Sequence, residues 1–257
     1  ATLNQTIFMQ IIPLSEGSFT IDQSKVFVPF NTQTEALQSR PVGSLLVEIQ
    51  PFVVVTKKDI ILIDTGLGYT NPAGQLQLHE NLEKAGIKPA SVTKVLMSHL
   101  HKDHAGGTTF SNIDNTARYI SFPYATYYIQ KREFEFATGI GSASYIPSDI
   151  LPLQDFSKVV WLDSDEGEID GGIKFQVTGA HSKFHQVFWI TEDNQTVFFG
   201  GDDAPQLQQM KSRFVAKYDY DGKKCMELRH AWLEKAKQEG WTFLFYHDIK
   251  TPIWAAH

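Results

Sequence analysis

The sequence predicts an α/β fold in which β-sheets pack together and helices cover them on the outside. Short runs of β-branched residues alternate with helical patterns along the chain. Hydrophobic residues make up 42% of the 257 residues and charged residues 20%, so the chain can bury a substantial core. No low-complexity segment or Pro/Gly-rich linker divides it. We therefore expect a single domain over residues 1–257, with an N-terminal arm of about 1–42.

In the first half of the chain, the elements are mostly strands. The residues Lys57-Lys58-Asp59 separate two apolar runs and predict a hairpin tip. Apolar residues recur with helical spacing over 76–85, and this helix ends at Gly86. The predicted strands are 43–49, 52–56, 60–63 and 94–97.

In the second half, an irregular region precedes a second block of strands. Residues 119–130 are partly β-like, 131–137 favour a helical turn, and 139–152 are typical of a loop that could form a substrate wall. Leu228, Trp232 and Ala236 lie on one face of a helix that ends at Gly240. The predicted strands are 173–178, 187–191, 196–199 and, as the last one, 241–246.

Composition excludes several classes of protein. Lys and Arg number 23 against 29 Asp and Glu, a net charge of −6 without a basic run, so we expect no nucleic-acid partner. Cys225 is the one cysteine, which excludes a disulfide framework and a thiolate-rich zinc site, and we expect it to be a packing residue. The apolar runs are too short to span a bilayer, so we expect no membrane partner.

The N-terminus leaves the compartment open. Residues 1–13 lack the basic and apolar regions of a signal peptide, which favours the cytoplasm. The first residue is Ala, not Met, so an export signal removed before this residue is not excluded.

Histidines cluster directly after the predicted strand 94–97. The pattern H-x-H-x-D-H occupies residues 99–104. Residues i and i+2 of a strand point to the same side, so His99 and His101 can address one metal ion, while Asp103 and His104 turn toward a second position. The following Ala105-Gly106-Gly107 allows close backbone packing and could open a helix. Imidazole and carboxylate ligands suit Zn²⁺. The alternative is a merely polar loop.

Five motifs in order resemble the metallo-β-lactamase superfamily of metal-dependent hydrolases. The resemblance extends from about Gly43 to Asp248. It implies a four-layer αββα sandwich. The motifs are Ile63-Asp-Thr-Gly66, the H-x-H-x-D-H pattern, Thr178-Gly-Ala-His-Ser-Lys-Phe-His185, Gly200-Gly-Asp202 and Tyr246-His247-Asp248.

The resemblance also implies a site for two divalent metal ions, with Zn²⁺ expected. It implies that His99, His101 and His181 hold one ion, that Asp103, His104 and His247 hold the other, and that Asp202 bridges them. Asp64 is expected either to orient a ligand or to cap local amides. The third motif departs from the common pattern, because Gly179-Ala180 and Lys183-Phe184 stand where Pro-Gly is frequent. His185 would lie behind the ligands or face the substrate.

A site of this kind hydrolyses its substrate with a hydroxide shared by the two ions. The region after Asp202 resembles the branch of N-acyl homoserine lactonases and methyl parathion hydrolase-like enzymes. It implies a quorum-quenching lactonase with a small lactone or ester as substrate. We expect catalytic roles for Asp103, Asp202, His185 and Tyr218, with Tyr220 as the alternative hydrogen-bond donor to the lactone. Asp202 stands where β-lactam hydrolysers often have a cysteine ligand, which disfavours that activity.

Other functions remain open at this point. The same chemistry serves a phosphotriesterase or arylesterase, and a glyoxalase-II-like thioesterase is a third option. A flavodiiron-type redox protein would need room for a flavin domain. A non-catalytic metal-binding module is the alternative outside the enzymes. A homodimer is also open, with the segment from Phe8 to Phe30 packing across a partner.

Overall fold

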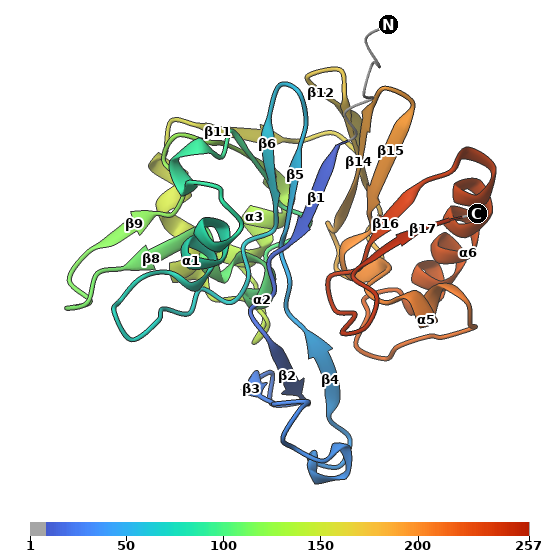
Figure 1. Ribbon diagram of the computed structural model, residues 1–257, viewed down its shortest axis with the longest axis horizontal. Coiled ribbons are helices and arrows are strands. Elements are labelled where there is room, and N and C mark those ends of the chain that lie inside the picture. Colours follow the sequence, from blue (N-terminus) through green and yellow to red (C-terminus); the bar gives the residue numbers. More distant parts are fainter. Residues whose placement is uncertain (1–8, 257) are drawn as a thin grey trace, which may run out of the picture.

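The structure, a computed structural model, describes residues 9–256 and consists of two six-stranded sheets packed face to face with helices outside them (Figure 1). The predicted αββα sandwich is thereby confirmed. Within the described residues, no helix is long and apolar enough to cross a membrane.

The first sheet has the strand order β1-β5-β6-β7-β10-β11. The hairpin of β5 and β6 is antiparallel, whereas β6, β7, β10 and β11 run parallel. Parallel strands end at the same edge of a sheet, so the segment after β7 emerges at the edge where the histidine cluster lies. The strands are β1 (Gln10–Pro13), β5 (Phe52–Val55), β6 (Ile60–Ile63), β7 (Lys94–Leu96), β10 (Thr126–Gln130) and β11 (Val159–Leu162).

The second sheet has the order β12-β13-β14-β15-β16-β17 and is antiparallel except for the parallel pair β15 and β16. A separate two-stranded hairpin is formed by β8 (Thr109–Ser111) and β9 (Arg118–Ile120). The strands of the second sheet are β12 (Glu166–Ile169), β13 (Ile173–Val177), β14 (Gln186–Glu192), β15 (Gln195–Phe199), β16 (Thr242–Leu244) and β17 (Ile253–Ala255).

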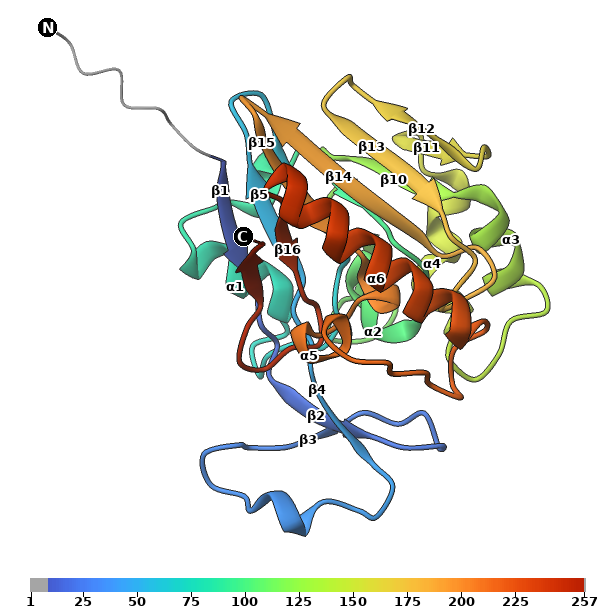
Figure 2. The ribbon, with the colours of Figure 1, turned by 90° about the vertical axis from the view of Figure 1, so that its right-hand side faces the viewer.

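Helices cover both outer faces (Figures 1 and 2). The longest, α6 (Gly222–Glu239), begins at Asp221, whose carboxylate accepts from the Lys224 amide. It ends at Gly240 in the left-handed conformation, as the sequence predicts. The other helices are α1 (Gln77–Lys84), α2 (Lys102–Ala105), α3 (Lys131–Thr138), α4 (Pro147–Ile150) and α5 (Leu207–Met210), and 3₁₀ turns occupy 37–39, 89–91, 106–108, 151–155 and 201–203.

The main core lies between the two sheets. Phe52 of the first sheet meets Phe199 of the second edge to face, with ring centroids 6.2 Å apart. At the edge remote from the histidines, Lys94 Nζ lies 2.8 Å from Asp59 and 2.7 Å from Asp170. Asp170 belongs to the turn between β12 and β13, so this ion pair joins the two sheets.

Several predicted elements need correction. The strand expected to be the last is followed by β17, which pairs with β16 at the sheet edge. The predicted loop 139–152 contains α4. The stretch Ala105-Gly106-Gly107 ends the short helix α2 at Ala105 and opens a single 3₁₀ turn at Gly106 rather than an α-helix. Cys225 is fully buried in α6, as expected of a packing residue.

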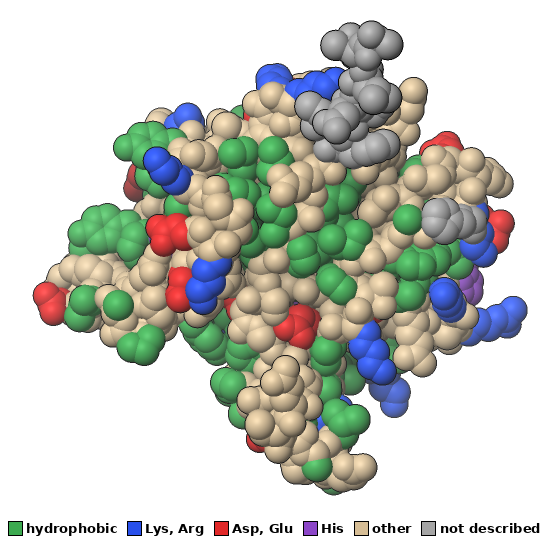
Figure 3. Space-filling model, in the orientation of Figure 1, with side chains coloured by type: hydrophobic (Ala, Val, Ile, Leu, Met, Phe, Trp, Pro, Cys, Tyr) green, Lys and Arg blue, Asp and Glu red, His purple; other side chains and the backbone are tan. Residues whose placement is uncertain are grey.

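The segment predicted as an N-terminal arm has two parts. Gln10–Pro13 forms β1 of the first sheet, whereas the chain from Ser18 onward forms a small projecting sheet (Figure 2). Phe8 lies outside the described residues, and the homodimer stays a prediction. The projecting sheet has the order β3-β2-β4, formed by β2 (Ser18–Ile21), β3 (Val28–Pro29) and β4 (Leu45–Glu48). The space-filling view shows hydrophobic side chains on this projection (Figure 3), and the exposed apolar residues of the sheet and its connecting segments are Val26, Val28, Leu37, Val42 and Leu45.

Candidate metal centre

The site lies at the edge where β7 and β15 end, and it gathers side chains from both sheets. His99 and His101 follow β7, and Asp103 and His104 lie in the short helix α2. From the second sheet, His181 comes from the loop between β13 and β14, Asp202 from the turn after β15 and His247 from the segment after β16. All seven residues expected to be ligands are therefore brought together.

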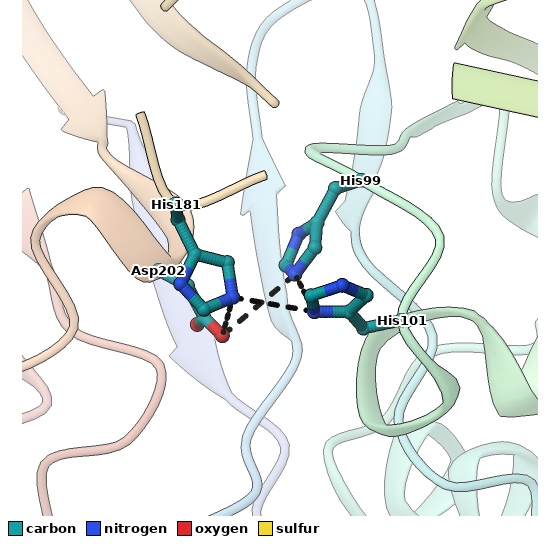
Figure 4. Close-up of side chains that lie close together, drawn as sticks. All are labelled: His99, His101, His181 and Asp202. Carbon is teal, nitrogen blue, oxygen red and sulfur yellow. Dashed lines mark hydrogen bonds and ion pairs between the residues drawn. The ribbon is translucent and has the colours of Figure 1, made fainter. Parts of the chain in front are cut away.

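Four of these side chains form a first cluster, composed of His99, His101, His181 and Asp202 (Figure 4). Nδ1 of His101 lies 3.1 Å from Nε2 of His99 and 3.2 Å from Nε2 of His181. Oδ2 of Asp202 lies 3.2 Å from Nε2 of His181 and 3.7 Å from Nε2 of His99. Three nitrogens and one oxygen thus converge on one point.

A second cluster consists of Asp103, His104, His247 and Asp202. Oδ1 of Asp202 lies 3.0 Å from Nε2 of His104 and 3.1 Å from Nε2 of His247. Oδ2 of Asp103 lies 3.4 Å and 3.3 Å from the same two nitrogens. Asp202 therefore belongs to both clusters, with one carboxylate oxygen directed at each.

In the second cluster, each histidine has one ring nitrogen facing away from the cluster (the outer nitrogen) and one facing into it (the inner nitrogen). The hydrogen bond of the outer nitrogen determines whether the inner nitrogen carries a proton or a lone pair. His247 Nδ1 lies 2.7 Å from the Glu48 carbonyl oxygen, which can only accept, so Nδ1 carries the proton. His104 Nδ1 donates in the same way to the Asp64 carboxylate at 2.7 Å. In the neutral ring, each Nε2 is then left with a lone pair directed at the cluster.

The first cluster follows the same rule at two of its histidines. His181 Nδ1 donates to the Asp219 carboxylate at 2.6 Å. His99 Nδ1 lies 2.9 Å from Ser98 Oγ, whose own hydroxyl donates to Asp64, so the histidine is the donor in this contact. Their inward nitrogens are also lone-pair donors, which is the arrangement that metal ligation requires.

These groups fit a pair of divalent cations. His104 Nε2 and Asp202 Oδ1 are buried without a hydrogen-bond partner, although they lie close together. Lone pairs facing one another in a buried site repel unless a cation or protons lie between them. Burial alone would lower the pKa of His247, but the Asp202 and Asp103 carboxylates raise this pKa to about 10. Nitrogen and carboxylate donors of this kind suit Zn²⁺ and neighbouring divalent ions.

Asp64 carries out both of the roles considered for it. Its Oδ2 accepts from His104, while Oδ1 accepts from the Ser98 amide at 2.8 Å. Asp64 adopts a positive φ of 58°, a conformation that aspartate tolerates better than most residues. Directly beyond it, the Thr65 carbonyl and a Cβ at Gly107 would be only 2.1 Å apart, so glycine is needed where the two loops touch.

His185 lies behind the ligands and is fully buried. Its Nε2 accepts from the Asp202 amide at 3.1 Å, and its Nδ1 lies 3.0 Å from Asp203 Oδ2. The ring therefore supports the backbone of Asp202 rather than facing a substrate. A Cβ at Gly201 would lie 2.6 Å from the same Nε2, which shows how closely this support is packed.

Two carboxylates that sequence reasoning missed stand behind the third motif. Asp203 accepts from the Thr178 hydroxyl at 2.6 Å and from the His181 amide at 2.8 Å. The side chain of Asp219 is almost fully buried against His181. No sequence pattern around Asp219 indicates its contact with His181, because the contact depends on how the segment before α6 folds back onto the third motif. Burial would raise the pKa of Asp203, but His185 nearby holds it below its usual range.

The two tyrosines considered as substrate contacts differ in position. The ring of Tyr218 lies 6.3 Å from that of His181 and is partly exposed. Burial and the Asp219 carboxylate raise the pKa of Tyr218, so its hydroxyl keeps its proton. Tyr220 is more exposed, and its amide donates to the His181 carbonyl.

Comparison with known proteins finds relatives by sequence. The chain is 24% identical over 219 residues to an N-acyl homoserine lactonase of Bacillus thuringiensis, covering 77% of this chain and 80% of the relative. It is 27% identical over 162 residues to the N-acyl homoserine lactonase AiiB of Agrobacterium fabrum, covering 55% of each.

Solved structures share the fold. A probable metal-dependent hydrolase from Staphylococcus aureus superposes with a TM-score of 0.73 at 21% identity, covering 96% of this chain and 92% of that one. AidC, a dizinc quorum-quenching lactonase in complex with a product, gives a TM-score of 0.69 at 20% identity, covering 95% and 89%. The model of the metallo-beta-lactamase superfamily matches residues 48–247, which contain every residue of both clusters. The chain belongs to the metallo-beta-lactamase superfamily.

Proposed function

We propose that the protein is a dinuclear metal-dependent hydrolase that opens the lactone ring of N-acyl homoserine lactones. The observation that carries the proposal is the pair of four-residue clusters joined by Asp202. The relatives named N-acyl homoserine lactonase direct the choice of substrate within this fold. Zn²⁺ is the proposed ion at both positions, since five histidines and two aspartates make up the donor set.

Two divalent ions held in this site would supply a nucleophile near neutral pH and polarise the attacked carbonyl oxygen. The chain's own residues would do the rest. His99, His101 and His181 would hold one ion, Asp103, His104 and His247 would hold the other, and Asp202, which belongs to both clusters, would contribute to both. Asp103 and Asp202 also contribute negative charge that offsets the charge of the ions.

Tyr218 is proposed to contact the substrate. Its hydroxyl keeps its proton and its ring lies beside His181, so it can donate a hydrogen bond to a lactone oxygen. His185 is proposed as a positioning residue, since its ring supports the Asp202 backbone.

The experiment pairs metal content with turnover. The protein is purified without chelator, its metals are quantified by mass spectrometry, and acid release from short- and long-chain acyl homoserine lactones is followed by pH-stat. We expect two ions per chain and rapid acid release, both lost in Asp202→Ala. The matched control is Asp221→Ala, which removes an aspartate that caps α6 outside both clusters.

Other outcomes would overturn parts of the proposal. Two ions per chain with faster turnover of paraoxon or aryl esters would move the assignment to a phosphotriesterase or arylesterase. Two ions without turnover of any ester would indicate a metal-binding module. Less than one ion per chain, not restored by Zn²⁺, Mn²⁺ or Co²⁺, would refute the ligand assignment.

A further inference from the structure

Helix α3 carries a buried carboxyl group for which the proposed function has no role. Glu133 is about 1% exposed and lies next to the histidine segment. Its Oε1 accepts from the Tyr145 hydroxyl at 2.8 Å and from the Leu100 amide at 3.3 Å. Leu100 stands between His99 and His101, so this carboxyl group is bonded to the backbone that carries both histidines.

Tyr145 connects this carboxyl group to the first cluster. Its ring meets the His101 ring edge to face, with centroids 4.7 Å apart. The residue is buried and lies in the segment between α3 and α4. The neighbouring Ser144 carbonyl accepts from the Lys102 amide at 2.8 Å, which holds this segment against the start of α2.

His101 differs from the other four histidines of the clusters. His99, His104, His181 and His247 each have their outer ring nitrogen bonded to a hydroxyl, a carboxylate or a carbonyl. Among residues 9–256, no hydrogen bond is made by the outer nitrogen of His101, whose Nδ1 faces the cluster. What the described residues offer this ring outside the cluster is the packing contact with Tyr145.

We propose that Tyr145 and Glu133 are positioning residues that fix the ring of His101 and hold the 139–146 segment beside the first cluster. The proposal rests on the metal site of the proposed function. Tyr145 achieves by ring contact what the hydrogen-bond acceptors achieve for the other histidines. Glu133 holds Tyr145 through its hydroxyl and at the same time holds the backbone at Leu100.

Glutamine should keep both hydrogen bonds at Oε1, although its amide nitrogen takes the place of Oε2, which is buried without a partner within residues 9–256, and so costs some stability. The role requires an acceptor at Oε1, which the glutamine side chain retains. Burial raises the pKa of Glu133, so an uncharged side chain matches this environment. Leucine has a similar size but no acceptor, so Glu133→Leu breaks both hydrogen bonds.

The test measures zinc affinity by titration against a chelating dye, which does not depend on any substrate. We expect Tyr145→Leu and Glu133→Leu to weaken the binding of one of the two ions by about 10-fold or more. Tyr145→Phe keeps the ring but loses the bond to Glu133, so its loss should be smaller. Glu133→Gln should remain within about threefold of the unmodified protein. Substitution with Co²⁺ adds a visible spectrum, which should change in Tyr145→Leu.

Tyr127→Phe is the matched control for Tyr145→Phe. The Tyr127 hydroxyl is buried and accepts from the Phe122 amide, and its ring contacts none of the cluster histidines. This variant should keep the zinc affinity of the unmodified protein.

Three results would overturn the proposal. The first is an unchanged zinc affinity in Tyr145→Leu. The second is a Glu133→Leu variant that folds and binds zinc as tightly as the unmodified protein, together with equal zinc affinities in Tyr145→Phe and Tyr127→Phe. The third is a Glu133→Gln variant as weak as Glu133→Leu. If Glu133→Leu does not fold, the two tyrosine variants decide. A protein that binds two ions and loses one in Tyr145→Leu, yet hydrolyses no lactone, would support this inference and refute the proposed function.

Discussion

The carboxylate of Asp219 accepts a hydrogen bond from Nδ1 of His181 at 2.6 Å, across 38 positions of sequence. The same segment donates the Tyr220 amide to the His181 carbonyl and the Asp221 amide to the Ala180 carbonyl. The chain before α6 therefore holds the third motif at both its side chain and its backbone. Because His181 is one of four side chains in the first cluster, this segment influences the metal site without contributing a ligand.

We expect Asp219→Ala to weaken zinc binding at the first cluster by about 10- to 100-fold, because the His181 ring loses the acceptor that fixes its orientation. The measurement is a zinc titration against a chelating dye. Asp221→Ala is the control, since it removes the cap of α6 and should cost about 1 kcal/mol of stability with zinc affinity intact. Equal zinc affinity in the two variants would contradict a role for Asp219.

We expect Tyr218→Phe to lower kcat/KM for acyl homoserine lactones by about 10- to 100-fold, because a hydrogen-bond donor to the substrate is lost. Metal content should stay at two ions per chain, since Tyr218 belongs to neither cluster. Tyr220→Phe makes the same chemical change at a more exposed position and should leave the kinetics unchanged. Were Tyr220→Phe the impaired variant, the assignment of the donor would pass to Tyr220.

Glu16 should make stability fall with increasing pH. Burial raises the pKa of Glu16 from 4.5 to about 8, although the Leu67 amide bonded to its Oε1 acts in the opposite direction. The folded protein then retains a proton that the unfolded chain releases. This contribution to the free energy of unfolding is complete below pH 4.5 and is lost as pH rises from there through about 8. Between these two values the slope is at most about 1.4 kcal/mol per pH unit.

The variant Glu16→Gln should not show this loss. Denaturant unfolding of both proteins between pH 5 and 9 measures the difference, which should widen in favour of the variant as pH rises. Glu35→Gln serves as the control, because Glu35 is an exposed residue in the segment between β3 and β4. Parallel stability profiles for all three proteins would show that Glu16 is ionised in the folded state.

The projecting sheet is expected to mediate a homodimer. Light scattering at micromolar concentration should give twice the mass of the chain, about 58 kDa by doubling 29.0 kDa. Val26→Asp with Val28→Asp should yield the monomer, because both exposed side chains lie in the segment expected to pack across a partner and charges there oppose burial. A monomeric mass for the unmodified protein would exclude the dimer.

Local pattern was sufficient for much of the fold. The strand 60–63 and the left-handed Gly240 after α6 agree with the structure, because short-range spacing and a conformational preference determine both. The strands β1 and β17 were not predicted. Each lies at the edge of its sheet and depends on pairing with one partner strand. For β1 the partner is β5, about 40 residues further along the chain, and for β17 it is the preceding strand β16.

The same distinction applies to the site. The first ligand motif could be predicted because its four residues, 99, 101, 103 and 104, are close in sequence and their spacing carries the geometry. The distant ligands His181, Asp202 and His247 were expected only from the family resemblance. Asp219 and the pair of Glu133 and Tyr145 could not be predicted, because a carboxylate or a ring behind a histidine leaves no spacing pattern. Their positions became visible only once α3 and the segment before α6 were placed in three dimensions.

The ion pair of Lys94 with Asp170 links the two sheets at the edge remote from the metal centre, and it does not depend on a bound metal ion. At the other edge, the two sheets are joined through the cluster, where Asp202 of the second sheet lies 3.0 Å from His104 Nε2, which follows the first sheet. A chelator would remove the links through bound ions at the metal edge and leave the hydrophobic core and the Lys94–Asp170 pair in place, so the loops at the metal edge should loosen first. Amide hydrogen exchange in the 99–104 and 178–185 segments should therefore rise on metal removal, before exchange rises in the strands of the core.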